Sequence, residues 1–379
     1  MKTQAAVLRT VGLERPYTKT TPLSIEEVHL DEPGPGEVLV QLVATGLCHS
    51  DLSTINGTRP RPVPMVLGHE AAGIVRAVGP GVQTVVPDDH VVLSLVPACG
   101  RCVPCQTGRP MLCEPGVRAN NAGTLIGGAH RFHGLNGEVM YHHLGASAFS
   151  EYTVVSEGSI TPIDRSIPLE EAAIFGCAVL TGIGAVVNTA RCEPGASAAI
   201  FGLGGVGLSA VIGAALAGCY PIVAVDVLET KLELARQLGA SHTVKAGQTD
   251  TIEQIRSITG GGADYSFEAV GSANVLGQAY AATRRGGTTV AVGLAHPSQN
   301  LQIAAIGLVA EERTLKGSYG GSSVPRRDLP RYLALYKAGR LPIDRLISGY
   351  LSLDQINSGF ENLADGAAVR QIIRFGDPG

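Results

Sequence analysis

The chain has 379 residues and a net charge of -4 at pH 7; 45% of its residues are hydrophobic and 16% are charged. This length favours two hydrophobic cores, and this composition excludes a disordered chain. The charge balance excludes the cationic surface that nucleic acid or an anionic membrane would need, so we expect a small-molecule partner.

The N-terminal segment, MKTQAAVLRT, lacks the long apolar core of a secretory signal. The sequence has no charge-free apolar run of the roughly 20 residues that a membrane-spanning helix needs. We therefore expect a cytoplasmic protein. In that setting the 8 cysteines favour metal binding or thiolate chemistry over disulfides.

The first part of the chain, from residue 2 to about 156, is predicted to be rich in strands. β-Branched runs at 38–40 and 91–93 are separated by glycine and proline clusters. The stretch 114–145 has little periodicity, so it is expected to be a long surface loop. Three histidines on it are expected to face solvent: His130, His133 and His142.

Four cysteines just before this stretch have the spacing C-x2-C-x2-C-x7-C: Cys99, Cys102, Cys105 and Cys113. Four thiolates so close along the chain can hold one zinc ion in a closed tetrahedral site that stabilises the fold and admits no substrate. Free thiols in a flexible loop, or an iron–sulfur cluster, are the alternatives. The spacing favours structural zinc.

A second metal-ligand set is spread along the chain: Cys48, His69 and Cys177. Two thiolates and one imidazole would leave the fourth zinc position for water or an alcohol oxygen, which is the coordination of a catalytic site. Spacing alone leaves a simpler interpretation open, in which each residue is an ordinary buried cysteine or histidine.

From about residue 181 the pattern changes to strand, turn and helix, as in 198–201, 208–217 and 221–226. This alternation predicts a parallel sheet with helices on both faces. Between the first strand and its helix lies a G-x-G-x-x-G turn, whose glycines let the backbone approach a pyrophosphate at the helix N-terminus. The predicted cofactor residues of the turn are Gly202, Gly204, Gly205, Val206 and Gly207.

Asp226 ends the next predicted strand, where its carboxylate can accept hydrogen bonds from ribose hydroxyls. The same charge would repel a 2′-phosphate, and the neighbouring Val227 is no cation, so the sequence favours NAD over NADP. Lys231 could reach the ribose or be a solvated surface lysine. Further along we expect a helix at 331–337 and a strand at 369–373.

These motifs, in this order, make the chain resemble the zinc-containing medium-chain alcohol dehydrogenases, especially the liver-type and glutathione-dependent formaldehyde dehydrogenase branch. The similarity spans nearly the whole chain and is carried by 68–70, the four-cysteine loop, 143–155 and 201–207. It implies an α/β fold of two domains. These are a GroES-like β-rich catalytic domain (1–180 and 319–379) and a doubly wound Rossmann domain for NAD (181–318).

The resemblance also implies roles for single residues. Cys48, His69 and Cys177 match the ligands of a catalytic zinc, and the four-cysteine loop matches the ligands of a structural zinc. Glu70 matches a carboxylate beside the catalytic metal, and Ser50 matches the hydroxyl that takes the substrate proton. The other matched positions are cofactor contacts at His49, Val292 and Arg370, and pocket residues at Arg59, Leu95, Arg118, His143, Leu144, Leu294 and Tyr319.

The sequence departs from the family pattern at some of these positions. Ser53 stands where liver-type enzymes end their proton relay with a histidine. Arg59 and Val117 stand where the formaldehyde dehydrogenase branch has the acidic residue and the arginine that recognise glutathione. Glutathione recognition is therefore not expected, whereas Arg59, Arg118 and His143 could favour a substrate that bears a carboxylate.

The function that the resemblance implies is hydride transfer between an alcohol, or the corresponding aldehyde or ketone, and NAD, with two zinc ions per subunit. A carrier-dependent oxidoreductase that keeps its NAD bound and a non-catalytic NAD-binding redox sensor are the alternatives. The segment 300–316 matches the region through which relatives dimerise, so a homodimer is expected. Cys192 and Cys219 lie outside both ligand sets and are expected to be small packing residues.

Overall fold

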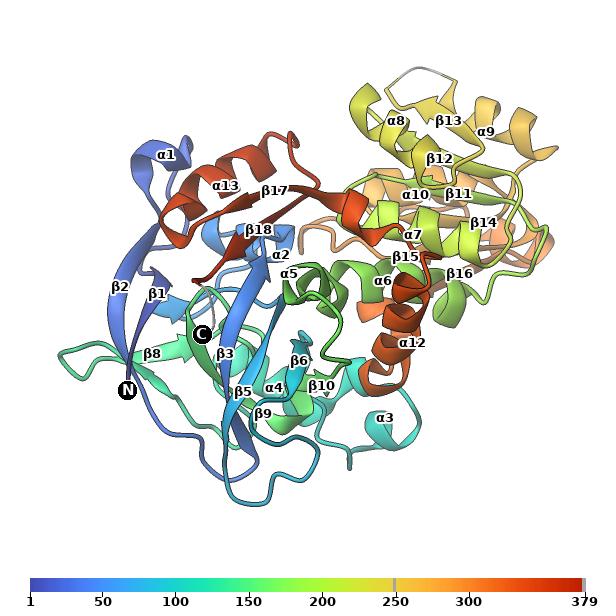
Figure 1. Ribbon diagram of the computed structural model, residues 1–379. Helices are drawn as coiled ribbons and strands as arrows, with labels where there is room; N and C mark the ends of the chain where they lie inside the picture. The colour runs from blue at the N-terminus through green and yellow to red at the C-terminus, as the bar shows by residue number, and fades with distance from the viewer. Residues whose placement is uncertain (248–249, 377–379) are drawn as a thin grey trace. The chain divides into compact units, whose positions relative to one another are not determined.

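The computed structural model describes residues 1–247 and 250–376, and the chain divides into two compact units. The first unit comprises Met1–Cys177, Val324–Lys337 and Asp344–Gly379, and the second comprises Ala178–Ser323 and Ala338–Ile343. Figure 1 shows that the first unit is dominated by strands, whereas helices and strands alternate in the second.

A small closed barrel forms one part of the first unit. Its strands, in order around the barrel, are β1 (Lys2–Leu8), β2 (Leu23–Leu30), β7 (Phe132–His133), β8 (Val139–His142) and β4 (Met65–Val66). Alternate residues along these strands point inward, as the pleat of a strand requires. Ala5 and Val7 of β1 pack with Val28 and Leu30 of β2 in this interior.

The stretch 114–145 differs from its predicted character as a surface loop. It contains the helix α4 (Glu114–Ala122) as well as β7 and β8, and Phe132 and Met140 are fully buried in the barrel. His142 is also fully buried, so the prediction that it faces solvent is wrong. The two strands are too short to show a period in the sequence, and their burial depends on pairing with β2 and β4, which are distant along the chain.

The larger sheet of the first unit has β3 (Glu37–Gly46) at its centre. Val38, Val40 and Leu42 alternate along one side of β3 and pack in the core beside this sheet. The order of the strands is β10 (Ile160–Pro162), β6 (His90–Leu93), β5 (Ala71–Val78), β3, β18 (Arg370–Arg374) and β17 (Ile347–Leu351), with β9 (Tyr152–Ser156) also paired to β3.

Besides α4, this unit contains the helices α1 (Tyr17–Thr20), α2 (His49–Ile55), α3 (Val103–Gln106), α5 (Leu169–Ala172), α12 (Pro325–Lys337) and α13 (Ile356–Ala364). The predicted helix at 331–337 is confirmed as the second half of α12. The predicted strand at 369–373 is confirmed as β18, shifted by one residue.

The second unit is a parallel sheet with the strand order of a doubly wound fold. That order is β13 (His242–Lys245), β12 (Ile222–Asp226), β11 (Ala198–Phe201), β14 (Ala263–Glu268), β15 (Thr283–Ala291) and β16 (Thr314–Gly317), with every pair parallel. Starting from β11, the chain adds β12 and β13 on one side of the sheet and then β14, β15 and β16 on the other side. The change of direction lies between β11 and β14, and sheets of this kind bind their ligands at that point. β11 and β12 are buried along their whole length, as expected of strands covered on both faces.

Helices connect these strands: α6 (Ala178–Gly184), α7 (Gly205–Leu216), α8 (Glu229–Gln237), α9 (Thr251–Thr259), α10 (Ala273–Ala282) and α11 (Ile306–Ala310). The predicted sequence of strand, glycine turn, helix and strand is thus confirmed, with α7 starting three residues earlier than expected. The parallel sheet and its helices confirm the predicted α/β class.

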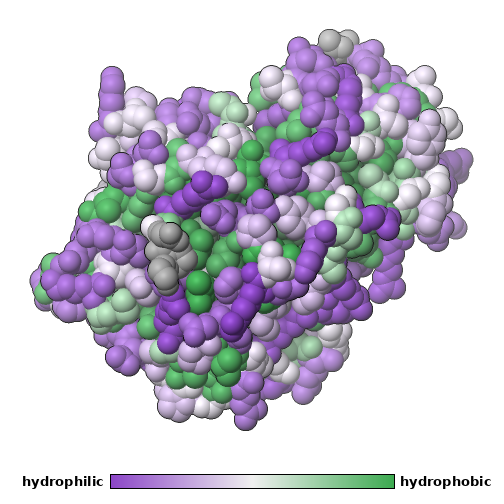
Figure 2. Space-filling model, viewed as in Figure 1, coloured by the Kyte–Doolittle hydropathy of each residue, from purple (hydrophilic) through white to green (hydrophobic). Residues whose placement is uncertain are grey.

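The surface drawn in Figure 2 mixes hydrophilic and hydrophobic residues in small areas. Within the described ranges, no single helix is both long and apolar enough to cross a bilayer. Two consecutive helical segments, Leu169–Gly176 and Ala178–Ala190, are bent relative to each other and are long and apolar enough only when they are counted together. Most residues of this pair are buried.

Candidate functional site

The catalytic ligand set is gathered by β3 and its neighbours in the larger sheet. Cys48 follows the end of β3 and caps α2, while His69 and Glu70 immediately precede β5. The Gly46 amide donates to the Glu70 carbonyl at 2.7 Å, which ties these two strand ends together. Cys177 follows a 3-10 turn, Ala173–Gly176, that packs against β3, β5 and β6.

Gly176 is required for Cys177 to come close to the other ligands. A Cβ at Gly176 would lie 1.9 Å from the Leu93 carbonyl oxygen of β6, a distance that no side chain could adopt. The backbone therefore presses against the sheet at this point and carries the Cys177 thiol to the other ligands.

The donor atoms of Cys48, His69, Glu70 and Cys177 lie within 4.8 Å of one another, and all four residues are buried. His69 Nε2 has no hydrogen-bond partner among the described residues. An unpaired buried nitrogen is costly unless something else binds it. Two thiol sulfurs beside it are the soft donors that zinc prefers, so Cys48, His69 and Cys177 fit the donor set that would hold a catalytic zinc ion.

The electrostatics of this set favour a thiolate at Cys48. A hydrogen bond from the Cys177 thiol outweighs the cost of burial and, together with the charges of Arg370 and His69, holds the pKa of Cys48 well below that of a free thiol. Thiolate is the form that binds a metal.

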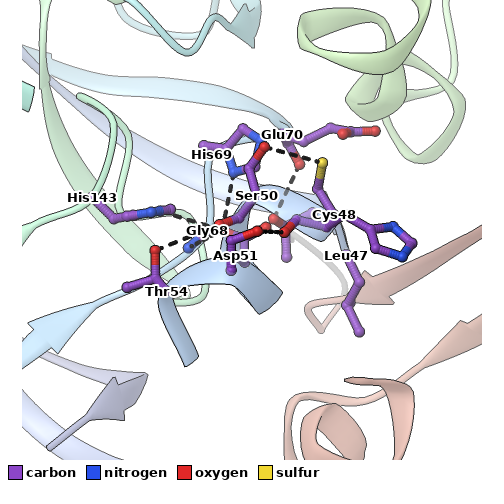
Figure 3. Close-up of polar contacts among 12 residues, drawn as sticks. Leu47, Cys48, Ser50, Asp51, Thr54, Gly68, His69, Glu70 and His143 are labelled. Atoms are coloured by element: carbon purple, nitrogen blue, oxygen red, sulfur yellow. Dashed lines mark hydrogen bonds and ion pairs between the residues drawn. The ribbon is translucent and has the colours of Figure 1, made fainter. Parts of the chain in front are cut away.

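Asp51 orients His69 and was not assigned a role from the sequence. Its Oδ1 accepts hydrogen bonds from His69 Nδ1 at 3.0 Å and from the Gly68 amide at 3.2 Å, and it lies 3.2 Å from His143 Nδ1. In Figure 3 the two imidazole rings reach this carboxylate from different sides. Burial opposes the charge of Asp51, but the two rings outweigh it and lower the pKa of the carboxyl. With Nδ1 held by Asp51, His69 presents the lone pair of Nε2 to a metal.

Glu70 and Arg370 form a second buried charged pair beside the thiols. Arg370 Nε lies 3.4 Å from Glu70 Oε1, and Arg370 Nη2 lies 4.0 Å from Cys48 Sγ. Burial raises the pKa of Glu70 to about 7, although Arg370 opposes this shift. Neither carboxylate oxygen of Glu70 has a hydrogen-bond partner within the described chain. Glu70 can therefore interact with a metal ion or ligand that binds beside it.

The four-cysteine set forms a second cluster, with its sulfur atoms also within 4.8 Å of one another. Cys113 Sγ accepts hydrogen bonds from the amides of Cys99 at 3.2 Å and Gly116 at 3.4 Å. Cys99 Sγ accepts one from the Cys102 amide at 3.4 Å. Amides that donate to sulfur stabilise thiolates, so this loop fits a structural zinc ion bound by four cysteines.

Seven further residues were predicted to line a substrate pocket. Leu95, His143 and Leu144 are buried in the first unit, whereas Arg118 on α4 is exposed and Arg59 is half-buried. Ser50 Oγ lies 3.8 Å from Cys48 Sγ, which places the expected proton acceptor beside the ligand set. Leu294 and Tyr319 belong to the second unit.

The glycine turn connects β11 to α7 as the cofactor motif requires. Gly202 has φ +86°, and a Cβ at Gly207 would lie 1.7 Å from the Gly202 carbonyl oxygen. Only glycine permits both the turn and this close contact between helix and strand. Gly204, Gly205 and Val206 lie at the start of α7, and the backbone amides at a helix N-terminus are suited to bind a phosphate.

Asp226 lies at the end of β12 beside this turn, and its Oδ2 accepts a hydrogen bond from the Leu203 amide at 2.7 Å. Lys231 is in the first turn of α8. Val292 follows β15, and its amide donates to the Glu268 carbonyl at 2.9 Å. The expected cofactor residues Asp226 and Val292 therefore lie at the carboxyl ends of two strands, β12 and β15, of the same parallel sheet.

Glu268 was missed in the sequence. It ends β14, is almost fully buried, and its Oε1 accepts hydrogen bonds from the amides of Val270 at 2.8 Å and Gly271 at 2.6 Å. It thereby fixes the loop at the point where the strand order reverses. An acidic residue at the end of a buried strand was the available signal.

Comparisons with known proteins agree with this geometry. Residues 34–165 match the family model described as the alcohol dehydrogenase GroES-like domain, and residues 205–338 match that of the zinc-binding dehydrogenases. The S-(hydroxymethyl)glutathione dehydrogenase of Paracoccus denitrificans is 37% identical over 384 residues, which cover 99% of this chain and 100% of the relative.

Solved structures agree as well. A zinc-binding alcohol dehydrogenase domain protein from Burkholderia ambifaria superposes with a TM-score of 0.94 at 37% identity, covering 100% of both chains. The benzyl alcohol dehydrogenase of Acinetobacter calcoaceticus superposes with a TM-score of 0.92 at 33% identity, covering 99% of this chain and 100% of the other. The resemblance inferred from the sequence is confirmed, and the chain belongs to the zinc-binding alcohol dehydrogenase family.

Proposed function

We propose that this protein is a zinc-dependent oxidoreductase that transfers a hydride between an alcohol, or the corresponding aldehyde or ketone, and NAD. The observation that carries the proposal is the buried set of Cys48, His69 and Cys177, in which His69 Nε2 faces the thiols without a protein partner among the described residues. The glycine turn with Asp226 supports NAD as the hydride acceptor.

The residues of the first unit have separate tasks. A zinc ion bound by Cys48, His69 and Cys177 would supply Lewis-acid chemistry to the alcohol oxygen. Asp51 keeps His69 in the tautomer that donates through Nδ1. Ser50 accepts the proton of the alcohol through its hydroxyl, which lies beside Cys48. Burial of the set excludes water from the reacting oxygen.

The route of the proton beyond Ser50 differs from that of liver-type relatives. Ser53 Oγ donates a hydrogen bond to the His49 carbonyl at 2.8 Å, within α2. Because a serine has no titration near neutral pH, it does not replace the histidine that ends the relay there. We propose that the proton leaves from Ser50 directly to solvent.

NAD recognition divides between several groups of this chain. NAD supplies the hydride acceptor. The amides at the start of α7 bind the pyrophosphate, and the Asp226 carboxylate accepts hydrogen bonds from the ribose hydroxyls. We assign His49 and Arg370 to phosphate binding, Lys231 to the ribose and Val292 to a further cofactor contact, on the basis of the family resemblance.

The substrate is proposed to be a simple primary or aromatic alcohol rather than a glutathione adduct. Arg59 and Val117 occupy the two glutathione-recognition positions with unsuitable side chains. His143 Nδ1 faces Asp51, so His143 is a poor cation for a substrate carboxylate. Arg59 and Arg118 remain as cations that could attract one.

The decisive experiment measures bound zinc and NAD in the purified protein and then kcat/KM with added NAD. The substrates are benzyl alcohol, 4-(hydroxymethyl)benzoate and S-(hydroxymethyl)glutathione. We expect two zinc ions per chain and efficient turnover of benzyl alcohol. Absence of turnover with added NAD, in protein that is purified with nucleotide bound, would instead support the carrier-dependent alternative. Equal efficiency with the first two substrates would exclude carboxylate recognition by Arg59 and Arg118.

We also propose a homodimer that forms through the segment 300–316. Ile306 and Val309 of α11 are 70% and 79% exposed, which is unusual for large apolar side chains. β16 is the last strand in the sheet order, so its outer edge is open to pairing with a second copy. Sedimentation at micromolar concentration should give a dimer, and Val309→Asp should give a monomer.

A further inference from the structure

Cys192 and Cys219 are the two cysteines outside both metal-ligand sets, and the fold brings them together. Cys192 lies between α6 and β11, and Cys219 lies between α7 and β12. The Gly195 amide donates to the Gly218 carbonyl at 2.7 Å, and the Tyr220 amide donates to the Ala196 carbonyl at 2.9 Å. These two bonds hold the segments side by side.

The interaction between the Cys192 and Cys219 side chains is the largest cause of the pKa shift of each thiol, so the two side chains lie next to each other. Their backbones are fixed by local bonds, from the Cys192 amide to the Val186 carbonyl at 3.1 Å and from the Cys219 amide to the Ala214 carbonyl at 3.0 Å. Each cysteine therefore lies in backbone that is ordered by its own hydrogen bonds. Packing alone, which the sequence predicted, does not require a thiol at either position.

Accessibility and charge suit a reaction between these thiols. Cys192 is half-buried, whereas Cys219 is only 6% exposed, so a small oxidant can enter but a second protein cannot reach both sulfurs. The hydrogen bond from Cys192 lowers the pKa of Cys219 and raises that of Cys192. One thiolate beside one thiol is the arrangement from which a disulfide forms.

We propose that Cys192 and Cys219 form a reversible disulfide when the protein meets hydrogen peroxide. A thiolate attacks one peroxide oxygen, the O–O bond breaks, and the distal oxygen leaves as hydroxide. The second sulfur then attacks the resulting sulfenic acid, the S–O bond breaks, and the second oxygen leaves as water after protonation. The two thiols lose two electrons and two protons, and the peroxide is reduced to two waters.

The location of the pair indicates what the bond would do. β11 leads into the glycine turn and α7 returns from it, so the bond would join the chain before β11 to the chain after α7. The linkage lies at the N-terminal end of β11, whereas the glycine turn follows its C-terminal end. We expect the bond to close this strand–turn–helix segment and stabilise it without blocking the NAD turn.

The test uses zinc-loaded, full-length protein treated with hydrogen peroxide, followed by thiol alkylation in denaturant and peptide mass spectrometry. We expect one linked peptide pair, containing Cys192 and Cys219, that a dithiol reductant separates, while the six metal-ligand cysteines are alkylated. In Cys192→Ser and Cys219→Ser the linked pair should disappear. Protein oxidised after denaturation serves as the control for pairing without the fold.

A second measurement distinguishes the effect of the disulfide from that of general oxidative damage to the protein. The oxidised protein should unfold about 2 to 4 °C higher than the reduced protein, and this difference should be absent in Cys192→Ser. NAD affinity should change less than about twofold, because the turn is not touched. Recovery of Cys192 and Cys219 as free thiols, after peroxide has oxidised other cysteines, would overturn the proposal.

Discussion

The two metal-ligand sets of this protein are built in opposite ways. The four-cysteine set lies within one stretch, 99–113, and its sulfurs accept hydrogen bonds from amides of the same loop. The catalytic set takes Cys48, His69 and Cys177 from three places and depends on pairing between β3 and β5. A local site can be recognised from spacing, whereas a site assembled by a sheet can be recognised only through the fold.

The difference extends to what surrounds the ligands. In the four-cysteine loop, backbone amides donate hydrogen bonds to sulfur atoms, as expected for a structural ion that takes no part in a reaction. The catalytic set has a buried His69 Nε2 and a buried Glu70 without hydrogen-bond partners in the described chain. Unsatisfied groups of this kind cost stability, and their presence marks the set as the reactive one.

The largest expected effect is the loss of a catalytic ligand. Cys177→Ser should lower kcat/KM for benzyl alcohol by at least about a thousandfold, because Lewis-acid stabilisation is worth several kcal/mol. Zinc content should fall from two ions per chain to one, while the circular dichroism spectrum is unchanged. Cys219→Ser, which removes a cysteine from the other unit, should keep both ions and full activity. Wild-type activity in zinc-depleted Cys177→Ser would contradict the assignment of the catalytic site.

Removal of a ligand from the loop should give the reverse pattern. Cys105→Ser should lower the midpoint of thermal unfolding by on the order of 10 °C, because metal binding contributes directly to folding. Well below that midpoint, kcat/KM per folded molecule should remain within a few-fold of wild type. Scanning calorimetry and kinetics at low temperature measure the two effects. A large loss of activity without loss of stability would show that the loop is not purely structural.

Asp51 tests whether the catalytic set depends on the groups that orient it. Asp51→Asn should weaken zinc binding or activity by about 10- to 100-fold, since it disturbs the hydrogen bond that fixes His69. Competition with a chromophoric chelator measures zinc affinity independently of turnover. Ser53→Ala, which removes a hydroxyl that donates to the His49 carbonyl on the same helix, is the matched control. Unchanged zinc affinity and activity in Asp51→Asn would mean that His69 is oriented without this carboxylate.

The last effect concerns stability at low pH rather than activity, and it involves His142, a buried histidine outside both metal-ligand sets. Its Nε2 accepts a hydrogen bond from the Arg131 amide at 3.1 Å, and burial lowers its pKa to about 3. Because the unfolded chain binds a proton near pH 6.5 and the folded chain does not, stability is complete above that pH and decreases as the pH falls toward 3. The slope is about 1.4 kcal/mol per pH unit.

His142→Gln should remove this contribution to the pH dependence of stability. Urea unfolding, measured between pH 4 and 7 at intervals of about one pH unit, tests this. His133→Gln changes a half-buried histidine that is paired with Asp31 on the barrel surface, so it should leave the slope from His142 in place. An identical pH dependence in wild type and His142→Gln would show that the imidazole is not kept neutral by burial.

Much of the fold could be predicted from the sequence, because the signals are local. The strand at 198–201, its glycine turn and the carboxylate of Asp226 follow one another within a single unit of the parallel sheet. The stretch 114–145 could not be predicted, because β7 and β8 are short and are stabilised by partners far along the chain. Asp51 and Glu268 were missed for a related reason, since their hydrogen bonds exist only after the chain has folded.

The central position of β3 has a consequence for how the protein acquires its metals. β3 pairs with β18, which lies far along the chain, and the Leu47 amide beside Cys48 donates to the Gln371 carbonyl at 3.0 Å. Contacts over such separations form late in folding. The four-cysteine loop can therefore bind zinc before the rest of the fold is complete, while the catalytic position forms only after β3 and β18 have paired.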